Sequence, residues 1–244
     1  MFPIRGIPEV QPGDDLCAIL AAAVRKQGLR WESGDVLVLA QKIVSKSEGA
    51  VVDLSRIAPS PAAQTLAEKL GRDARFFEVV LQQSRRILRR ERVLIAETRH
   101  GLICANAGVD HSNVPGQDFV TVLPADPDRS AQEIARRMKA LTGKRFAVII
   151  SDTFGRPWRL GLTNVAIGAS GLSVLADLRG QRDRSGKILQ ATVLAVADEL
   201  AAAAGLVMGK AEGIPAVIIR GFGYRRKNEP AAKILRPAGE DLFR

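Results

Sequence analysis

AVIISDTFGRPWR, residues Ala147–Arg159, is the most informative segment of the chain. Its first four residues are apolar, which is typical of a buried strand. The strand is expected to end at a group of polar and charged residues: Ser151, Asp152, Thr153, Gly155, Arg156 and Arg159. Carboxylate and hydroxyl oxygens suit a hard cation such as Mg²⁺, and guanidinium groups suit phosphate. An ordinary strand followed by a polar turn would use the same residues, so both interpretations stay open at this point.

The composition is that of a soluble globular protein, with 46% apolar and 25% charged residues in 244. The N-terminus has no apolar segment of the signal-peptide type. The most apolar long segment, Ala191–Met208, contains Asp198 and Glu199, which argues against a membrane span. Cys17 and Cys104 lie far apart and are expected to be reduced, packed thiols. We therefore expect a cytoplasmic protein that does not bind membranes.

The formal net charge of +10 favours anionic partners, either nucleic acid or small phosphorylated molecules. Arginines are concentrated in Arg85–Arg92, and basic residues recur in Tyr224–Lys227. A solvated helix face is the alternative interpretation of the first cluster. Only 5% of the residues are aromatic, and no nucleic-acid-binding module is recognisable. Nucleic-acid binding is therefore the less favoured alternative.

The apolar pattern predicts a mixed α+β fold. Helices are expected over five segments: Asp15–Lys26, Pro61–Leu70, Ala74–Arg90, Ser130–Gly143 and Ala191–Met208. Strands are expected over seven: Asp35–Ala40, Arg92–Glu97, Gly101–Ala105, Asp118–Leu123, Ala147–Ile150, Val165–Gly171 (or a turn) and Ala216–Arg220. A capping box at Ser130–Glu133 is expected to begin the fourth helix. Residues 41–49 are expected to form a polar segment after the first strand, and the basic tail from Tyr224 is expected to be frayed.

Standard nucleotide-binding motifs are absent, and the two histidines, His100 and His111, make a zinc site or a Ser-His-Asp triad improbable. Two acidic residues remain, because Asp110 and Asp152 each follow an apolar run. If these carboxylates converge they repel each other, unless a divalent cation lies between them. Thr153 would add a hydroxyl oxygen to such a site.

Further residues near these positions could bind a nucleotide: Lys42 or Lys46, Arg156 and Arg159 through phosphates, and Asn113 through an amide or hydroxyl. This set of residue types would serve phosphoryl transfer, in which catalysis is mostly positioning and charge neutralisation.

Eight segments, in order, resemble the coenzyme F420-0: L-glutamate ligase family. They are GIPEV (6–10), PGDDL (12–16), QKIVSKSEG (41–49), NAGVDHSN (106–113), SDTFGRPWR (151–159), AIGASGL (166–172), VADELAAAAGLVMGK (196–210) and IPAVIIRG (214–221). The resemblance extends from Gly6 to Gly221. Each segment alone is a weak signal, but together at family spacing they are highly specific.

The resemblance implies a GTP-dependent ligase that adds L-glutamate to coenzyme F420-0 through an acyl phosphate, releasing GDP and phosphate. It implies a single ligase unit over residues 1–244, with a core of about 4–223 and a basic tail of 224–244. Family members are intertwined homodimers of mixed α+β fold, with two closely associated subdomains. They use Mg²⁺ or Mn²⁺, and some respond to K⁺.

The resemblance also implies roles for individual residues. GTP contacts would be Ile7, Pro8, Glu9, Val10, Gln41, Lys46, Asn113, Met208, Gly209, Lys210 and Gly213. The metal ligands would be Asp110, Asp152 and Thr153. Catalysis would depend on Asp110, Asp152 and Arg156.

One residue departs from the family pattern. Many members carry Glu or Gln as a ligand for a second metal where this chain has Lys210. Glu212 could replace that ligand, or Lys210 could neutralise phosphate in place of the cation. We therefore expect one metal site. A related enzyme that joins another acceptor or another amino acid remains an alternative function.

Overall fold

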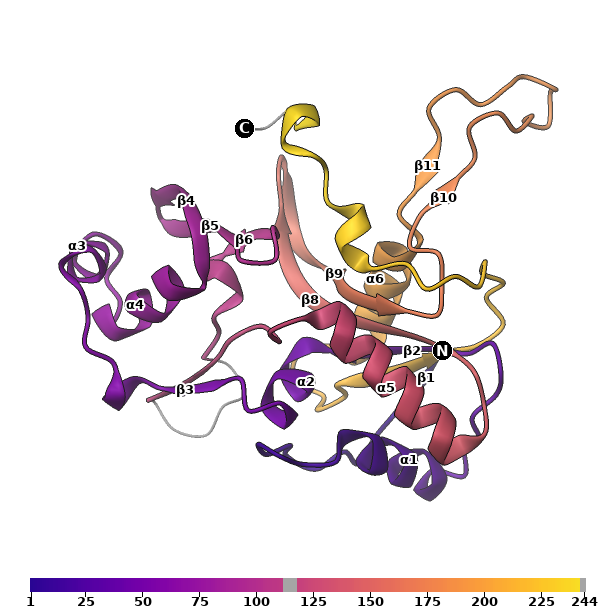
Figure 1. The fold of residues 1–244 in the computed structure, drawn as a ribbon, viewed down its shortest axis with the longest axis horizontal. Coiled ribbons are helices and arrows are strands. Elements are labelled where there is room, and N and C mark those ends of the chain that lie inside the picture. The colour runs from indigo at the N-terminus through magenta and orange to yellow at the C-terminus, as the bar shows by residue number, and fades with distance from the viewer. Residues whose placement is uncertain (112–117, 242–244) are drawn as a thin grey trace.

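The computed structural model describes residues 1–111 and 118–241, and its centre is a five-stranded sheet (Figure 1). The strand order is β1–β12–β2–β8–β9. The bounds are Phe2–Pro3 for β1, Ala216–Ile219 for β12, Val36–Ala40 for β2, Ala147–Arg156 for β8 and Arg159–Ser170 for β9. β2 and β8 are parallel, and the other neighbouring pairs of this sheet are antiparallel. The sheet is therefore mixed, as the sequence predicts.

Helices cover both faces of this sheet. Leu37 and Leu39 of β2 pack in one core with helices α1 (Leu16–Lys26), α2 (Gln41–Ser47) and α5 (Pro127–Thr142). Val36 and Val38 pack in a second core with α6 (Val196–Met208). Alternate side chains of a strand point to opposite faces, so a strand covered on both sides must be apolar throughout. This explains the continuous apolar runs in β2 and β8.

A smaller lobe lies between α2 and α5 in the chain and to one side of the main sheet (Figure 1). Its elements are β3 (Val51–Asp53), η1 (Leu54–Arg56), α3 (Pro61–Leu70), α4 (Ala74–Gln83), β4 (Ser84–Glu91), β5 (Val93–Thr98), β6 (Ile103–Ala105), η2 (Asn106–Gly108) and β7 (Phe119–Thr121). Phe76, Phe77, Val80 and Leu94 belong to its own core. The α+β class is thus confirmed. Intertwining with a second chain stays a prediction.

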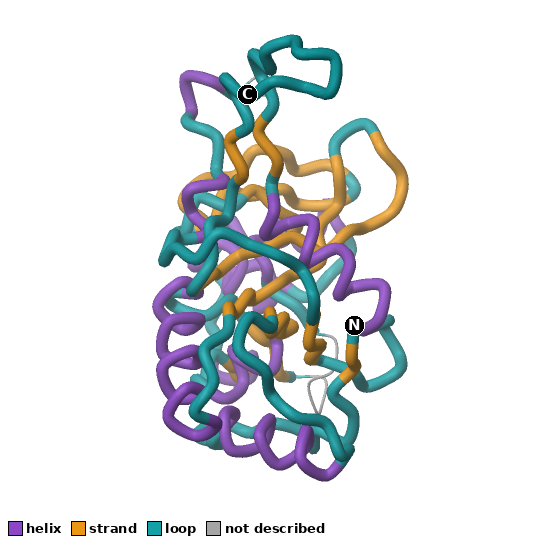
Figure 2. The backbone as a smooth tube through the Cα atoms, turned by 90° about the vertical axis from the view of Figure 1, so that its right-hand side faces the viewer, coloured by secondary structure: helices purple, strands orange, loops and turns teal. Residues whose placement is uncertain are grey.

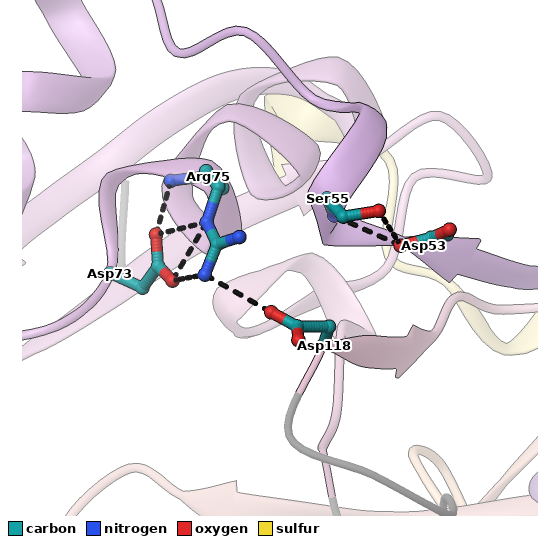
Figure 3. Close-up of polar contacts among 5 residues, drawn as sticks. All are labelled: Asp53, Ser55, Asp73, Arg75 and Asp118. Carbon is teal, nitrogen blue, oxygen red and sulfur yellow. Dashed lines mark hydrogen bonds and ion pairs between the residues drawn. The ribbon is translucent and has the colours of Figure 1, made fainter.

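Polar contacts join the elements of this lobe (Figure 3). Arg75, in the first turn of α4, donates to Asp73 at 2.6 Å and pairs with Asp118, just before β7, at 3.2 Å. Asp53 accepts from the backbone N–H of Ser55 at 2.9 Å and so begins η1. Surface ion pairs contribute at most about 1 kcal/mol each, so the apolar core provides most of the lobe's stability.

Several local predictions are confirmed. Asp15 caps α1 by accepting from Ala18 N at 3.0 Å, and Ser60 caps α3 by accepting from Ala63 N at 3.3 Å. The expected hairpin around residues 99–101 joins β5 to β6. Cys17 and Cys104 are buried free thiols, and burial raises the pKa of Cys104 to about 12. Both caps and the hairpin depend on residues that are close together in the sequence.

The predicted helix Ala74–Arg90 is too long. α4 ends at Gln83, and Arg85–Arg92 lies largely in β4, which pairs with β5. Glu97 on β5 pairs with Arg86 at 2.6 Å. The arginine cluster is thus part of a strand, so its interpretation as a helix face is wrong. Hairpin pairing with β5, the next element of the chain, overrides the weak helical preference of this segment.

Other element boundaries also differ from the predictions. The polar segment 41–49 is mostly helix α2. α5 begins at Pro127, and Asp126 is its N-cap. The prediction that a capping box at Ser130–Glu133 begins this helix is therefore wrong. Ser130 lies inside the helix, where its hydroxyl donates to Asp126 O. α6 begins at Val196, because β11 (Val193–Leu194) pairs instead with β10 (Ala176–Asp177). The pairing of β11 with β10 therefore decides where α6 begins.

The segment Ala147–Arg159 does not turn at Ser151. β8 continues to Arg156 and pairs with β9, so Pro157 and Trp158 form the turn of a long hairpin. Figure 2 shows this strand pair extending away from the helices. Asp152 and Thr153 therefore lie within a strand, where their positions are set by the sheet.

The basic tail is not frayed over the residues that the structure describes. Asn228 Oδ1 accepts from the Ser170 hydroxyl at 3.0 Å, and Asp128 accepts from Ala231 N at 2.6 Å. Glu229 is buried, and its carboxylate accepts from the Ser173 hydroxyl at 2.7 Å. The segment also contains η3 (Ala231–Ile234) and η4 (Ala238–Glu240). These contacts hold it on the main sheet and α5.

We predict that Glu229→Gln destabilises the protein by about 1–3 kcal/mol at pH 7. Hydrogen bonds from Lys227, Lys233 and Ser173 lower the pKa of Glu229 to about 2. The ionised form is therefore favoured by folding above about pH 4.5, and this stabilisation is lost as the pH falls towards 2. Urea unfolding of both proteins between pH 3 and pH 7 should show a difference that shrinks with acidity. A constant difference would contradict the assignment.

Candidate functional site

A pocket of about 300 Å³ opens where β2 ends, beside residues 151–153 in the middle of β8. The two strands are parallel and Ala40 is paired with Ser151, so the carboxyl end of β2 lies next to the midpoint of β8. The Ser151 hydroxyl donates to Leu39 O at 3.2 Å and reinforces this junction. Beyond it, β2 enters α2 and β8 continues to Asp152. The pocket therefore collects residues that are far apart in the sequence.

The pocket includes all the GTP contacts implied by the family resemblance that the structure describes. They are Ile7, Pro8, Glu9, Val10, Gln41, Lys46, Met208, Gly209, Lys210 and Gly213. Asp152 and Thr153 line the same pocket. Asn113 lies outside the described residues. The binding roles of these residues stay predictions, but their common location is a structural fact.

Two lysines of α2, one turn apart, bring positive charge to this region. Lys46 is buried and pairs with Glu9, and Lys42 pairs with Asp110 at a distance of 2.7 Å between Nζ and Oδ2. Residues four apart lie on one helix face, so both ammonium groups extend from the same side of α2. The sequence left open which of them contacts phosphate, and both line the pocket.

Asp110 reaches the site from the smaller lobe. Its backbone N–H donates to Thr121 O at 3.0 Å, and its carbonyl accepts from Thr121 N at 2.9 Å. Burial raises the pKa of Asp152 to about 6, and the negative charge of Asp110 adds to this rise. The charges of Lys42 and Lys210 act in the opposite direction. The two carboxylates are therefore close enough to interact.

This donor set fits a divalent cation of the Mg²⁺ type. Over residues 1–111 and 118–241, no group of three His, Cys, Asp or Glu side chains surrounds a common point. Mg²⁺, however, is usually held by one or two carboxylates together with the phosphates of a substrate. Asp110 and Asp152 would supply the carboxylates and Thr153 a hydroxyl oxygen.

Asn164 lines the pocket from β9 and is not among the site residues predicted from the sequence. The register of the β8–β9 hairpin pairs it with Thr153, whose hydroxyl donates to Asn164 Oδ1 at 2.9 Å. Local sequence carries no signal for this contact, because it depends on where the hairpin turns.

Four candidate residues do not line the pocket itself: Asp110, which lies beside Lys42, and Arg156, Arg159 and His111. Arg156 donates to Leu160 O at 2.6 Å near the hairpin turn, and its catalytic role stays a prediction. His111 stacks on Phe76 in the smaller lobe, with ring centroids 5.1 Å apart.

A family model described as F420-0:gamma-glutamyl ligase matches residues 5–221. The chain belongs to this family. A relative from Methanothermobacter thermautotrophicus, named coenzyme F420:L-glutamate ligase, is 47% identical over 100% of this chain and 98% of its own length. A relative of the same name from Methanopyrus kandleri is 50% identical over 97% of this chain and 94% of its own length. Another from Archaeoglobus fulgidus is 40% identical over 100% of this chain and 96% of its own length. The resemblance found in the sequence is thus confirmed.

No helix among the described residues of this ligase-family chain is both long enough and apolar enough to cross a membrane.

We predict that Asp152→Asn stabilises the metal-free protein at pH 8 by on the order of 1–3 kcal/mol. The folded pKa of about 6 lies above the ordinary value of 3.8, so ionised Asp152 destabilises the fold at high pH. Below about pH 4 the side chain is protonated in both states, and the difference should vanish. Urea unfolding in EDTA across this pH range measures the effect. Equal stability at pH 8 would contradict it.

Proposed function

We propose that this protein is a GTP-dependent ligase that joins L-glutamate to coenzyme F420-0. The observation that carries this proposal is the pocket beside β2 and β8, in which the residues expected to contact GTP lie together with Asp152 and Thr153. Its relatives' names supply the glutamate and the coenzyme as substrates.

The reaction would proceed in two steps. An oxygen of the terminal carboxylate of F420-0 attacks the γ-phosphorus of GTP, and GDP leaves with the electrons of the broken P–O bond. The amine of glutamate then attacks the carbonyl carbon of this acyl phosphate, forming the C–N bond as phosphate departs and losing a proton. Both steps concentrate negative charge on phosphate oxygens, so catalysis would depend on positioning and positive charge.

The chain's residues fit these requirements. Lys42 and Lys46 place ammonium groups on one side of the pocket. Asp110, Asp152 and Thr153 would hold Mg²⁺ or Mn²⁺, which would neutralise phosphate charge when bound. Residues 7–10, near the start of the chain, and residues 208–211 and 213, near its end, line the pocket and would enclose the nucleotide. A response to K⁺ and a cytoplasmic location stay predictions.

An assay with purified protein, Mn²⁺, GTP, L-glutamate and F420-0, read by mass spectrometry, tests this function. We expect a product heavier by one or more glutamyl units that requires every component. Retained GTP binding without product would indicate a related ligase with another acceptor or amino acid. Loss of GTP binding as well would contradict the proposal and return attention to the basic surface of β4.

We further predict that Asp152→Asn lowers the rate of product formation about 100-fold or more, because it removes a carboxylate from the reacting centre. Asp177→Asn, on the exposed β10 strand, is the matched control and should leave the rate unchanged. Circular dichroism would verify that both variants fold. Undiminished turnover of Asp152→Asn would refute a role for this carboxylate in holding the metal.

We also propose that the protein is a homodimer that uses the β8–β9 hairpin as part of its interface. Trp158, Leu160 and Leu162 are 85%, 97% and 68% exposed near the hairpin turn. Such an exposed apolar group is typical of a surface that a partner covers, and the resemblance to intertwined dimers indicates a second copy of this chain.

Light scattering coupled to size exclusion tests the dimer. We predict the mass of a dimer for the native chain and of a monomer for Leu160→Ser combined with Leu162→Ser. Leu141→Ser, at a 55% exposed position on α5, is the control and should stay dimeric. A native chain of monomeric mass, or a double variant that remains dimeric, would overturn this proposal.

A further inference from the structure

The loop after α6 contains both residues of the alternative that the sequence left open: Glu212 as a replacement metal ligand, or Lys210 as a positive charge in place of the cation. In the structure Glu212 is folded back on its own loop, where Oε2 accepts from Lys210 N at 2.8 Å and Ala211 N at 2.9 Å. These backbone hydrogen bonds hold the pKa of Glu212 below its ordinary value. Among the described residues, the pocket is lined by Lys210, Ala211 and Gly213 but not by Glu212.

Gly209 makes this fold of the loop possible. Its backbone has a φ of 59° and a ψ of −153°, a region that is essentially restricted to glycine. A Cβ atom at this position would lie 1.8 Å from Glu212 Oε2. Any other residue would therefore displace the carboxylate from the N–H groups that it holds.

Lys210 extends from this braced loop to the strand that carries Asp152. Its Nζ donates to Thr153 Oγ1 at 2.6 Å, and its positive charge lowers the pKa of Asp152. An ammonium group has three N–H donors, so two remain for other acceptors while one contacts Thr153. Lysine commonly binds phosphate as a point charge.

We propose that Lys210 is a built-in cation of this pocket, that it binds phosphate oxygens of the nucleotide, and that Glu212 and Gly209 are positioning residues that aim it at Thr153. This inference rests on the proposed function, because it requires a nucleotide in the pocket. A hydroxyl oxygen accepts two hydrogen bonds or ligands. Lys210 takes one of these positions on Thr153, which leaves one for the cation expected at Asp110 and Asp152. The positive charge of Lys210 opposes a second divalent ion at the same place.

Calorimetric titration with GTP, in Mg²⁺ and separately in EDTA, tests the proposal. We expect Lys210→Met, which keeps the chain length but removes the charge, to weaken GTP binding about tenfold or more, the loss of about 1.4 kcal/mol. Lys139→Met, at an exposed position on α5, is the matched control and should bind like the native protein. Titration of Mn²⁺ in the presence of GTP, followed by electron paramagnetic resonance, should give one bound ion per chain.

The positioning role has its own readout. Glu212→Ala should weaken GTP binding in the same direction but less, and adding it to Lys210→Met should cause no further loss, because the residues act as a unit. Both positions are exposed, so neither change should impair folding. GTP binding by Lys210→Met equal to that of the native protein in both buffers would overturn the inference and leave the proposed function intact. A native chain that binds no GTP would overturn the proposed function and this inference with it.

Discussion

The parallel pairing of β2 and β8 is the constraint on which the site depends. Because both strands run in the same direction, Ala40 and Ser151 lie side by side, and the segments that follow them continue on the same side of the molecule. The first segment is α2 with its two lysines, and the second is the hairpin with Asp152. An antiparallel pair would place these groups at opposite edges. Helices on both faces protect the pairing, so the strands can be apolar throughout while the chemistry is confined to their ends.

The carboxylates show what this arrangement costs in stability. Asp152 is partly buried beside the charge of Asp110, and both effects raise its pKa. A protein selected for stability alone would not retain an acidic side chain there, since an amide of the same shape would avoid the penalty. Lys42 offsets part of the repulsion through its ion pair with Asp110. Because Asp110 comes from the smaller lobe and Lys42 from α2, the electrostatics of the site also link the two parts of the chain.

The sequence predicted residue types and local elements well, and their partners poorly. Caps such as Asp15 and Ser60 act within three residues, so they are visible in the sequence. The strand identity of Arg85–Arg92 depends on β5, and the position of Asn164 depends on the hairpin register. Ser130 illustrates the limit, because its hydroxyl can cap a helix or bond to a carbonyl inside one. The residues expected to bind the nucleotide were predicted by resemblance, whereas their common location in one pocket is visible only in the fold.

The loop at Met208–Gly213 shows why a change of residue must be interpreted with its surroundings. The sequence left two alternatives open, in which Glu212 replaces the metal ligand that the resemblance implies at position 210, or Lys210 neutralises phosphate instead. The backbone excludes the first alternative in the described structure, because two N–H groups already hold the carboxylate and Gly209 leaves room for it. The carboxylate of Glu212 is not part of the described pocket lining, whereas Lys210 is. The loop thus presents a positive charge to the pocket, and under the proposed function this fixed charge would neutralise part of the charge of the nucleotide phosphates.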